Sequence, residues 1–157
     1  MEHIWGPWRM EYIRAEKPEG CILCDKPKEN NDAENFILYR GEKNYVMMNR
    51  YPYSPGHLMV VPYRHFDTLE KLTPEERSEH MEIVSLCVGA LRKELGPEGF
   101  NLGMNLGKVA GAGIDDHVHS HIVPRWNGDT NFMTVVSDIR VVPEALAATY
   151  EKLKSKF

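Results

Sequence analysis

Residues 73–95 predict one long helix, the secondary-structure element that the sequence marks most clearly. Thr73 and Glu76 have the spacing of a capping box, with Pro74 at the first helical position. Apolar residues then recur at about every fourth position, so one face of the helix should be buried. This stripe consists of Ile83, Val84, Cys87, Ala90, Leu91 and Leu95. The pair Gly96-Pro97 ends the helix.

Short apolar runs lie on both sides of this helix in the sequence and predict strands. The runs are residues 36–39, 45–48, 58–61, 100–106 and 117–123. Short, hairpin-like connections favour an antiparallel α+β sheet over a parallel doubly wound one. A last helix is expected from Pro143, with Leu146, Tyr150 and Leu153 on its apolar side, and residues 16–34 are expected to form a loop.

The composition limits the class of protein. We expect one domain over residues 1–157, with an N-terminal loop at about 1–34 and a C-terminal extension at about 127–157. A net charge of −4 makes a nucleic-acid polymer an unfavoured partner. No apolar run approaches the roughly 20 residues of a membrane helix, and no signal peptide is recognisable. Three cysteines without a secretory signal favour a cytoplasmic location over a disulfide framework.

Three histidines alternate at positions 117, 119 and 121. On a strand this alternation places them on one face, with Val118, Ser120 and Ile122 on the other. Imidazoles at this spacing suit two chemistries, a catalytic zinc with a water ligand or a nucleophilic histidine assisted by its neighbours. The glycine-rich stretch at 107–113 can present backbone N–H groups to an anion, which favours the chemistry of a phosphate.

The segment His117–Val123 resembles the signature of the histidine-triad (HIT) superfamily. Three further stretches carry the same resemblance: 49–52 with 55–62 is similar to the nucleoside-binding strand pair, and 101–107 to the strand before the triad. The flanks at 5–12 and 124–133 resemble bacterial diadenosine tetraphosphate phosphorylases or hydrolases, although their tryptophans suit core or dimer packing equally well. The resemblance implies an antiparallel sheet with a long central helix and a C-terminal helix, paired into a homodimer.

The resemblance also implies a mechanism. His119 would attack the α-phosphorus of a dinucleoside polyphosphate and carry a nucleoside monophosphate as a phosphoramidate, which water or inorganic phosphate then releases. The backbone carbonyl of His117 would orient the nucleophilic ring. His121 would bond a phosphate oxygen, and His57 would lie near the same phosphate.

Substrate contacts follow from the same resemblance. Asn49 would contact the ribose, and Asn105 with the backbone of Gly111, Ala112 and Gly113 would donate to phosphate oxygens. Val46, Met48 and Leu58 suit either a base pocket or the core. One departure concerns the loop at 110–116, which lacks the glutamine that many dinucleoside polyphosphate hydrolases carry there. The acceptor, water or inorganic phosphate, therefore stays open.

Cys21 and Cys24 have the spacing of a zinc knuckle, which a redox pair or two free thiols can share. A structural zinc needs about four ligands. By resemblance to relatives with this cysteine pair, His65 and His117 would complete the set. His3 and His80 have no neighbouring chemistry in the sequence and are expected on the surface.

Three other functions compete with dinucleotide cleavage. A related enzyme would hydrolyse nucleoside phosphoramidates or aminoacyl adenylates, and a zinc hydrolase would hold its metal on the triad. A non-catalytic sensor would bind AMP without turnover. Complete retention of the triad disfavours the sensor.

Overall fold

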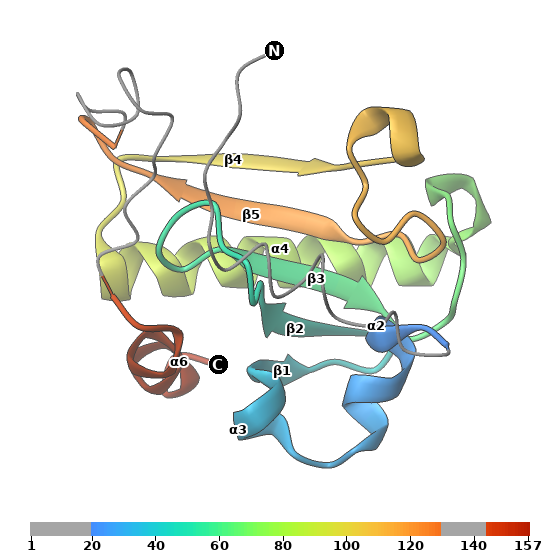
Figure 1. Ribbon diagram of the computed structural model, residues 1–157, viewed down its shortest axis with the longest axis horizontal. Coiled ribbons are helices and arrows are strands. Elements are labelled where there is room, and N and C mark those ends of the chain that lie inside the picture. The colour runs from blue at the N-terminus through green and yellow to red at the C-terminus, as the bar shows by residue number, and fades with distance from the viewer. Residues whose placement is uncertain (1–19, 130–143) are drawn as a thin grey trace.

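The computed structural model describes residues 20–129 and 144–157, and in them an antiparallel sheet forms the centre of the fold (Figure 1). Its strands are β1 Ile37–Arg40, β2 Asn44–Met48, β3 Leu58–Pro62, β4 Gly99–Met104 and β5 Ser120–Arg125. Their order is β1-β2-β3-β5-β4, and every neighbouring pair is antiparallel. The expected antiparallel α+β class is confirmed.

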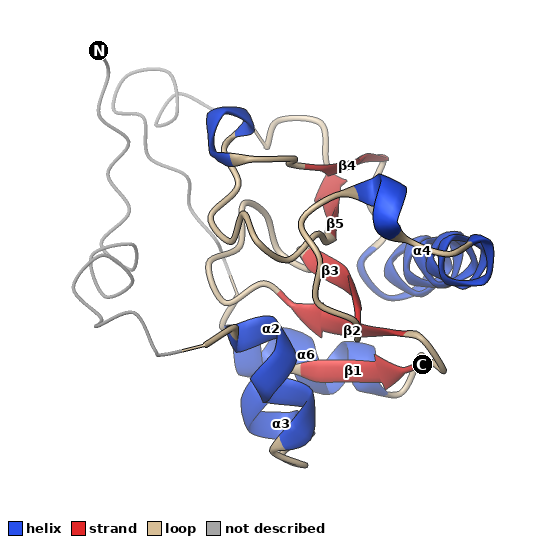
Figure 2. Cartoon of the chain, turned by 90° about the vertical axis from the view of Figure 1, so that its right-hand side faces the viewer, coloured by secondary structure: helices blue, strands red, loops and turns tan. Residues whose placement is uncertain are grey.

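Helix α4 Pro74–Leu95 crosses one face of this sheet (Figure 2). The capping box is present, since Thr73 Oγ1 accepts from the Glu76 backbone 3.2 Å away and Glu76 Oε2 accepts from the Thr73 backbone 2.8 Å away. Gly96 ends the helix with a left-handed backbone at φ 56°. The apolar stripe meets the sheet in a core that includes Val46, Met48, Leu58, Val60, Cys87, Leu91 and Ile122, each 0% exposed. Val46, Met48 and Leu58 are therefore core residues and do not line a base pocket.

The second face of the sheet carries a smaller apolar cluster. Leu23, Ile37, Tyr45, Met47, Met59 and Val61 form it, with Cys21, Tyr63 and Ile114 packed against it. The Tyr45 hydroxyl donates to the Leu23 carbonyl at 2.7 Å. This contact ties the segment with the cysteine pair to the sheet.

Three sequence-based boundaries differ from the structure. The stretch expected as a loop contains the short helices α2 Ile22–Asp25, η1 Lys26–Lys28 and α3 Asp32–Asn35. Strand β4 ends at Met104, and β5 begins only at Ser120, so His117 and His119 precede the strand. The 3₁₀ turns η2 Leu69–Lys71 and η3 Lys108–Ala110 complete the connections.

Helix α6 Leu146–Lys154 packs beside α4 and β1. It starts later than expected, and Pro143 lies outside the described residues, as do His3 and the flanking stretches at 5–12 and 130–133. Tyr150 and Leu153 are buried as predicted. Among the described helices, none is both long and apolar enough to cross a bilayer.

Candidate functional site

His119 has one ring nitrogen held by the backbone and one left open. Its Nδ1 lies 2.8 Å from the carbonyl oxygen of His117, which can only accept a hydrogen bond. Nδ1 therefore carries the proton and Nε2 the lone pair. Within the described residues no hydrogen bond reaches this Nε2. Every side-chain nitrogen that is buried there has a hydrogen-bond partner. Since Nε2 has none, it is not buried and is open to solvent. Burial lowers the pKa of His119, which keeps the ring neutral and nucleophilic.

His121 and His57 extend this site into a row of three imidazoles. The ring centroids of His119 and His121 are 4.8 Å apart, and His57 Nε2 lies 3.0 Å from His121 Nδ1. His57 is 1% exposed and His121 is half-buried. The structure thus brings together His57, His119 and His121, as the sequence predicts. His117 turns its ring away to a second cluster, described below.

The loop before β3 fixes His57 to the sheet and to α4. Ser54 Oγ donates to the Pro124 carbonyl at 2.8 Å, and the His57 backbone donates to the Ser54 carbonyl at 3.1 Å. Gly56 has a φ of +74°, and a Cβ there would lie 2.5 Å from a methyl group of Leu95. The left-handed backbone and the close approach between loop and helix favour glycine at this position. His57 is therefore held by the backbone.

A cleft of about 450 Å³ lies beside His121 and is lined by residues of the paired strands β4 and β5. Its lining residues are Tyr53, Asn101, Leu102, Gly103, Met104, Asn105, His121, Val123 and Arg125. Gly103 pairs with His121 across the two strands, and its missing side chain leaves space in front of the imidazole. The volume is in the range of small-molecule sites. Asn105, predicted to bind phosphate, lies in this cleft.

The remaining predicted substrate contacts stay predictions. Asn49 follows β2, and its Oδ1 accepts from the Tyr51 backbone at 2.8 Å. In the glycine-rich loop, the Gly111 N–H donates to the Lys108 carbonyl at 3.0 Å and the Ala112 N–H to the Gly107 carbonyl at 3.4 Å. Phosphate binding by these two amides would require them to exchange loop hydrogen bonds for bonds to the ligand.

Cys21, Cys24, His65 and His117 form the second cluster. One ligand atom from each lies within 4.8 Å of the others. His117 Nδ1 is 3.2 Å from Cys21 Sγ and 3.4 Å from Cys24 Sγ, and His65 Nδ1 is 3.4 Å from Cys24 Sγ. A tetrahedral zinc with thiolate and imidazole ligands separates sulfur from nitrogen by about 3.5 Å. The donor set and its spacing therefore fit a structural zinc.

Hydrogen bonds around these ligands prepare them for a metal. His117 Nε2 donates to the Pro62 carbonyl at 2.8 Å, which leaves the Nδ1 lone pair facing the two thiols. His65 Nε2 lies 3.8 Å from an Asp116 carboxylate oxygen. The backbone N–H of Val118 donates to the Phe66 carbonyl at 2.7 Å, so the segment between the two clusters is fixed as well.

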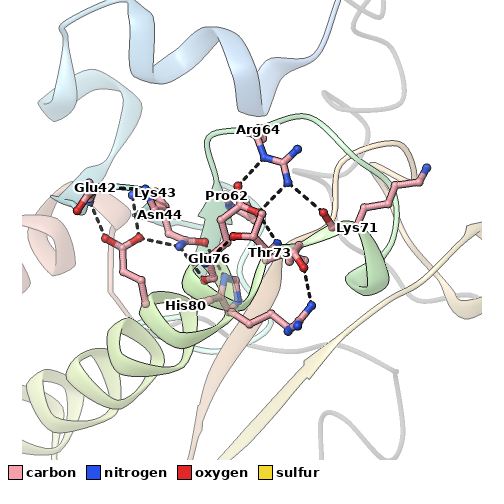
Figure 3. A network of polar contacts seen from close by, with 12 residues as sticks. Glu42, Lys43, Asn44, Pro62, Arg64, Lys71, Thr73, Glu76 and His80 are labelled. Carbon is pink, nitrogen blue, oxygen red and sulfur yellow. Dashed lines mark hydrogen bonds and ion pairs between the residues drawn. The ribbon is translucent and has the colours of Figure 1, made fainter.

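The expectation that His80 lies on the surface is wrong, since its side chain is 2% exposed. Its Nδ1 lies 2.9 Å from Asn44 Oδ1, and its Nε2 lies 2.7 Å from Ser120 Oγ. Asn44 in turn donates to Glu79 at 2.8 Å, within a network of polar residues at the start of α4 (Figure 3). Ser120 lies between His119 and His121, so this network supports the histidine segment from behind.

The sequence holds a signal that identifies His80 as buried. It lies three residues before Ile83 and seven before Cys87, so it continues the stripe of α4 that faces the sheet. At the outer end of the same network, Arg64 forms an ion pair with the buried Glu76, at 2.8 Å for one of its two bonds.

Comparison with known proteins places these features in a family. The HIT domain model matches residues 30–128. The AP-4-A phosphorylase of Mycobacterium tuberculosis is 36% identical over the whole chain and 85% of that protein. An adenosine 5'-monophosphoramidase of Schizosaccharomyces pombe is 30% identical over 87% of the chain and 97% of its own length. The solved structure of a zinc-bound histidine triad family protein from Mycobacterium smegmatis superposes with a TM-score of 0.71 and 27% identity, covering 87% of this chain and 92% of that one.

Proposed function

This chain belongs to the HIT domain family, and on that premise we propose that it cleaves dinucleoside polyphosphates, diadenosine tetraphosphate in particular, through a nucleotidyl-histidine. The observation that carries the proposal is the state of His119, a neutral imidazole whose Nδ1–H is held by the His117 carbonyl and whose Nε2 is open. This is the arrangement that a nucleophilic histidine needs.

The reaction has two balanced steps. In the first, the Nε2 lone pair of His119 attacks the α-phosphorus, a P–N bond forms, and the P–O bond to the rest of the polyphosphate breaks. In the second, an acceptor oxygen attacks the same phosphorus, and the P–N bond breaks to restore the ring. His121 and Asn105 donate hydrogen bonds to phosphate oxygens as charge develops on them.

Inorganic phosphate is the acceptor that we favour. The loop at 110–116 carries no glutamine, and the relative that matches the whole chain with 36% identity is named AP-4-A phosphorylase. With diadenosine tetraphosphate, phosphate as acceptor gives ADP and ATP, whereas water gives AMP and ATP.

Substrate labelled at the α-phosphate tests both parts of the proposal. Protein is mixed with it, with and without phosphate, and quenched in base. We expect base-stable, acid-labile label on the wild type and none on His119→Ala, with ADP appearing only when phosphate is present. AMP and ATP in both conditions would exclude the phosphorylase, and absence of protein-bound label during turnover would exclude the covalent route.

A second substrate class has its own support. The relative named adenosine 5'-monophosphoramidase is 30% identical over 87% of this chain, and the proposed first step is chemically the same with an amine as leaving group. Parallel assays with adenosine phosphoramidate and diadenosine tetraphosphate decide between them through kcat/KM. A higher value for the phosphoramidate would overturn the dinucleotide assignment.

We also propose that Cys21, Cys24, His65 and His117 hold a structural zinc. The metal would supply four bonds that tie α2 to the histidine segment, and all four of its positions would be filled by protein. His117 belongs to this set and the His119 Nδ1 proton is held by a carbonyl, an arrangement that disfavours a catalytic zinc on the triad. One zinc per chain by elemental analysis is expected, and its absence from protein purified without chelator would contradict the assignment.

A second copy of the chain is the proposed partner. Among the described residues, strand β4 is an edge of the sheet; its Leu102 is 53% exposed, and Met81 on α4 is 62% exposed. Unpaired edges and exposed apolar side chains favour pairing. Sedimentation equilibrium should give twice the monomer mass of 18.1 kDa, and Leu102→Lys should weaken the association. A wild-type monomer at micromolar concentration would refute it.

A further inference from the structure

A neutral imidazole carries one N–H and one lone pair, so fixing either nitrogen fixes the other. Burial lowers the pKa of His57 to about 3 and that of His121 to about 4. Both rings are therefore neutral near pH 7. Each ring then has two possible tautomers, and the neighbouring groups select between them.

The hydrogen bonds around these rings run in one direction. The backbone N–H of Tyr53 lies 3.1 Å from His57 Nδ1 and can only donate, so Nδ1 accepts and the His57 proton is on Nε2. His57 Nε2 lies 3.0 Å from His121 Nδ1 and donates to it. The proton of His121 is therefore on its Nε2.

We propose that His57 is a positioning residue. Its Nδ1 accepts from the Tyr53 N–H, its Nε2–H therefore donates to His121 Nδ1, and His121 in turn presents its Nε2–H to the phosphate. We call these two linked hydrogen bonds the relay. The identity of the phosphate rests on the proposed function, while the relay rests on the hydrogen bonds alone. His57 itself is covered at 1% exposure, whereas His121 lines the cleft. Of these two rings, His121 is therefore the one placed to meet the substrate.

The relay gives neighbouring rings opposite roles. The His117 carbonyl leaves a lone pair on His119 Nε2, whereas the relay leaves a proton on His121 Nε2, and the ring centroids are 4.8 Å apart. A phosphate oxygen is an acceptor, so a His121 lone pair would repel it. The donor form attracts that oxygen as the nucleophile approaches the phosphorus.

The source of the direction is a backbone group in a fixed loop. Ser54 donates a hydrogen bond to the Pro124 carbonyl on β5, and Gly56 lies against α4. The Tyr53 ring stacks on the His57 ring, with 4.8 Å between the ring centroids. A peptide N–H cannot reverse its role as a hydroxyl or an imidazole can. The tautomer of His121 is thus set without a charged group.

Long-range ¹H–¹⁵N correlation spectra of the full chain, loaded with zinc and labelled in its imidazoles, test the relay at pH 7. Single substitutions assign each ring. We expect His57 and His121 as Nε2–H tautomers and His119 as the Nδ1–H tautomer. An Nδ1–H tautomer for His121 in the wild type would overturn the proposal. These spectra use no substrate, so an enzyme inactive on diadenosine tetraphosphate would refute the proposed function and leave this result standing.

A matched pair of variants tests the consequence. His57→Gln keeps an N–H donor within reach of His121, and His57→Met has a similar shape without a donor. In the methionine variant we expect a mixture of His121 tautomers and a kcat about tenfold below that of the glutamine variant, with KM changed much less. Equal kcat values, or an unchanged His121 tautomer in a folded His57→Met, would overturn the relay. If the methionine variant fails to fold, the wild-type and His57→Gln spectra still decide.

Discussion

The two sides of the histidine segment use the same residue type for different purposes. In front of the sheet, His119 and His121 each have one nitrogen bonded within the protein and one left open. Behind it, His80 has both nitrogens bonded, to Asn44 and to Ser120. Burial lowers the pKa of all three rings, so all three are neutral near pH 7 and charge does not separate them. The rings differ in how many nitrogens lack a hydrogen bond within the protein. A ring with both nitrogens bonded supports the fold, and a ring with one open nitrogen is available for chemistry.

The largest effect is expected when the open nitrogen of His119 is removed. The comparison between the two sides fails if turnover survives this change. His119→Ala should lower kcat by about 10³-fold or more, since it removes the nucleophile. The metal content and the midpoint of thermal unfolding should stay close to those of the wild type. Steady-state assays, elemental analysis and calorimetry check the three quantities. Residual activity within tenfold of the wild type would show that another group attacks phosphorus.

His117 is the intermediate case, because its Nε2 is bonded to Pro62 and its Nδ1 faces two thiols. Cys24→Ser should release the metal and destabilise the fold. A metal at about 1,000 times its dissociation constant stabilises by about 4 kcal/mol, equivalent to a Tm shift of about 10 °C. Cys87→Ala, in the core, is the control that should keep its metal. Tm is measured for each variant with and without zinc. If zinc changes the Tm of both variants by the same amount, the four residues do not hold the metal.

The hydrogen bonds of His80 to Asn44 and Ser120, behind the histidine segment, should matter for stability more than for catalysis. His80→Leu leaves Asn44 Oδ1 and Ser120 Oγ without their partner, and we expect it to lower the free energy of unfolding by about 3 kcal/mol. Urea unfolding measures this loss, and a double-mutant cycle with Ser120→Ala should give a coupling of about 1 kcal/mol. KM and the pH dependence of kcat should not change. A coupling of zero would mean that the contact between His80 and Ser120 does not stabilise the fold.

The smallest effect is expected at the outer end of the rear network. Arg64 holds the pKa of Glu76 at about 2, below its ordinary value of 4.5. The carboxylate therefore stabilises the fold above pH 4.5, and this contribution is lost as the pH falls to 2. Glu76→Gln keeps the capping box and should cost about 1 kcal/mol at pH 7, because Arg64 is half exposed.

Unfolding curves of the wild type and Glu76→Gln between pH 7 and 2.5 check the sign of this effect. The difference between them should shrink at low pH. A difference that stays constant with pH would mean that the charge of Glu76, and with it the ion pair to Arg64, is not the source of the difference.

The sequence predicts the parts of the site that depend on local spacing. The capping box places α4, the cysteine spacing indicates a metal, and the alternation from His119 to Ile122 separates the two faces of the histidine segment. These signals are short-range, since a helix start or a strand face is set by residues a few positions apart. The family resemblance supplied the companions of the cysteine pair, which lie up to 96 positions away.

Contacts between distant elements are the parts that sequence reasoning missed. The partners of His80 are 36 and 40 positions away, on β2 and β5. The resemblance placed His57 and His121 near the same phosphate, but the bond between their rings, which spans 64 positions, was not predicted. The helical turns at 22–35 were missed for another reason, as each is three or four residues long and shows no periodicity.

Helix α6 has a consequence for how the chain is made. Tyr150 bonds the carbonyl of Ile37, 113 residues earlier, and Leu153 is fully buried in the core shared with β2 and β3. A nascent chain on the ribosome therefore cannot complete this core until residues 146–154 have left the exit tunnel. Until then the apolar side chains that α6 covers stay exposed, even where α4 has already packed on the sheet, and this exposure during synthesis favours aggregation.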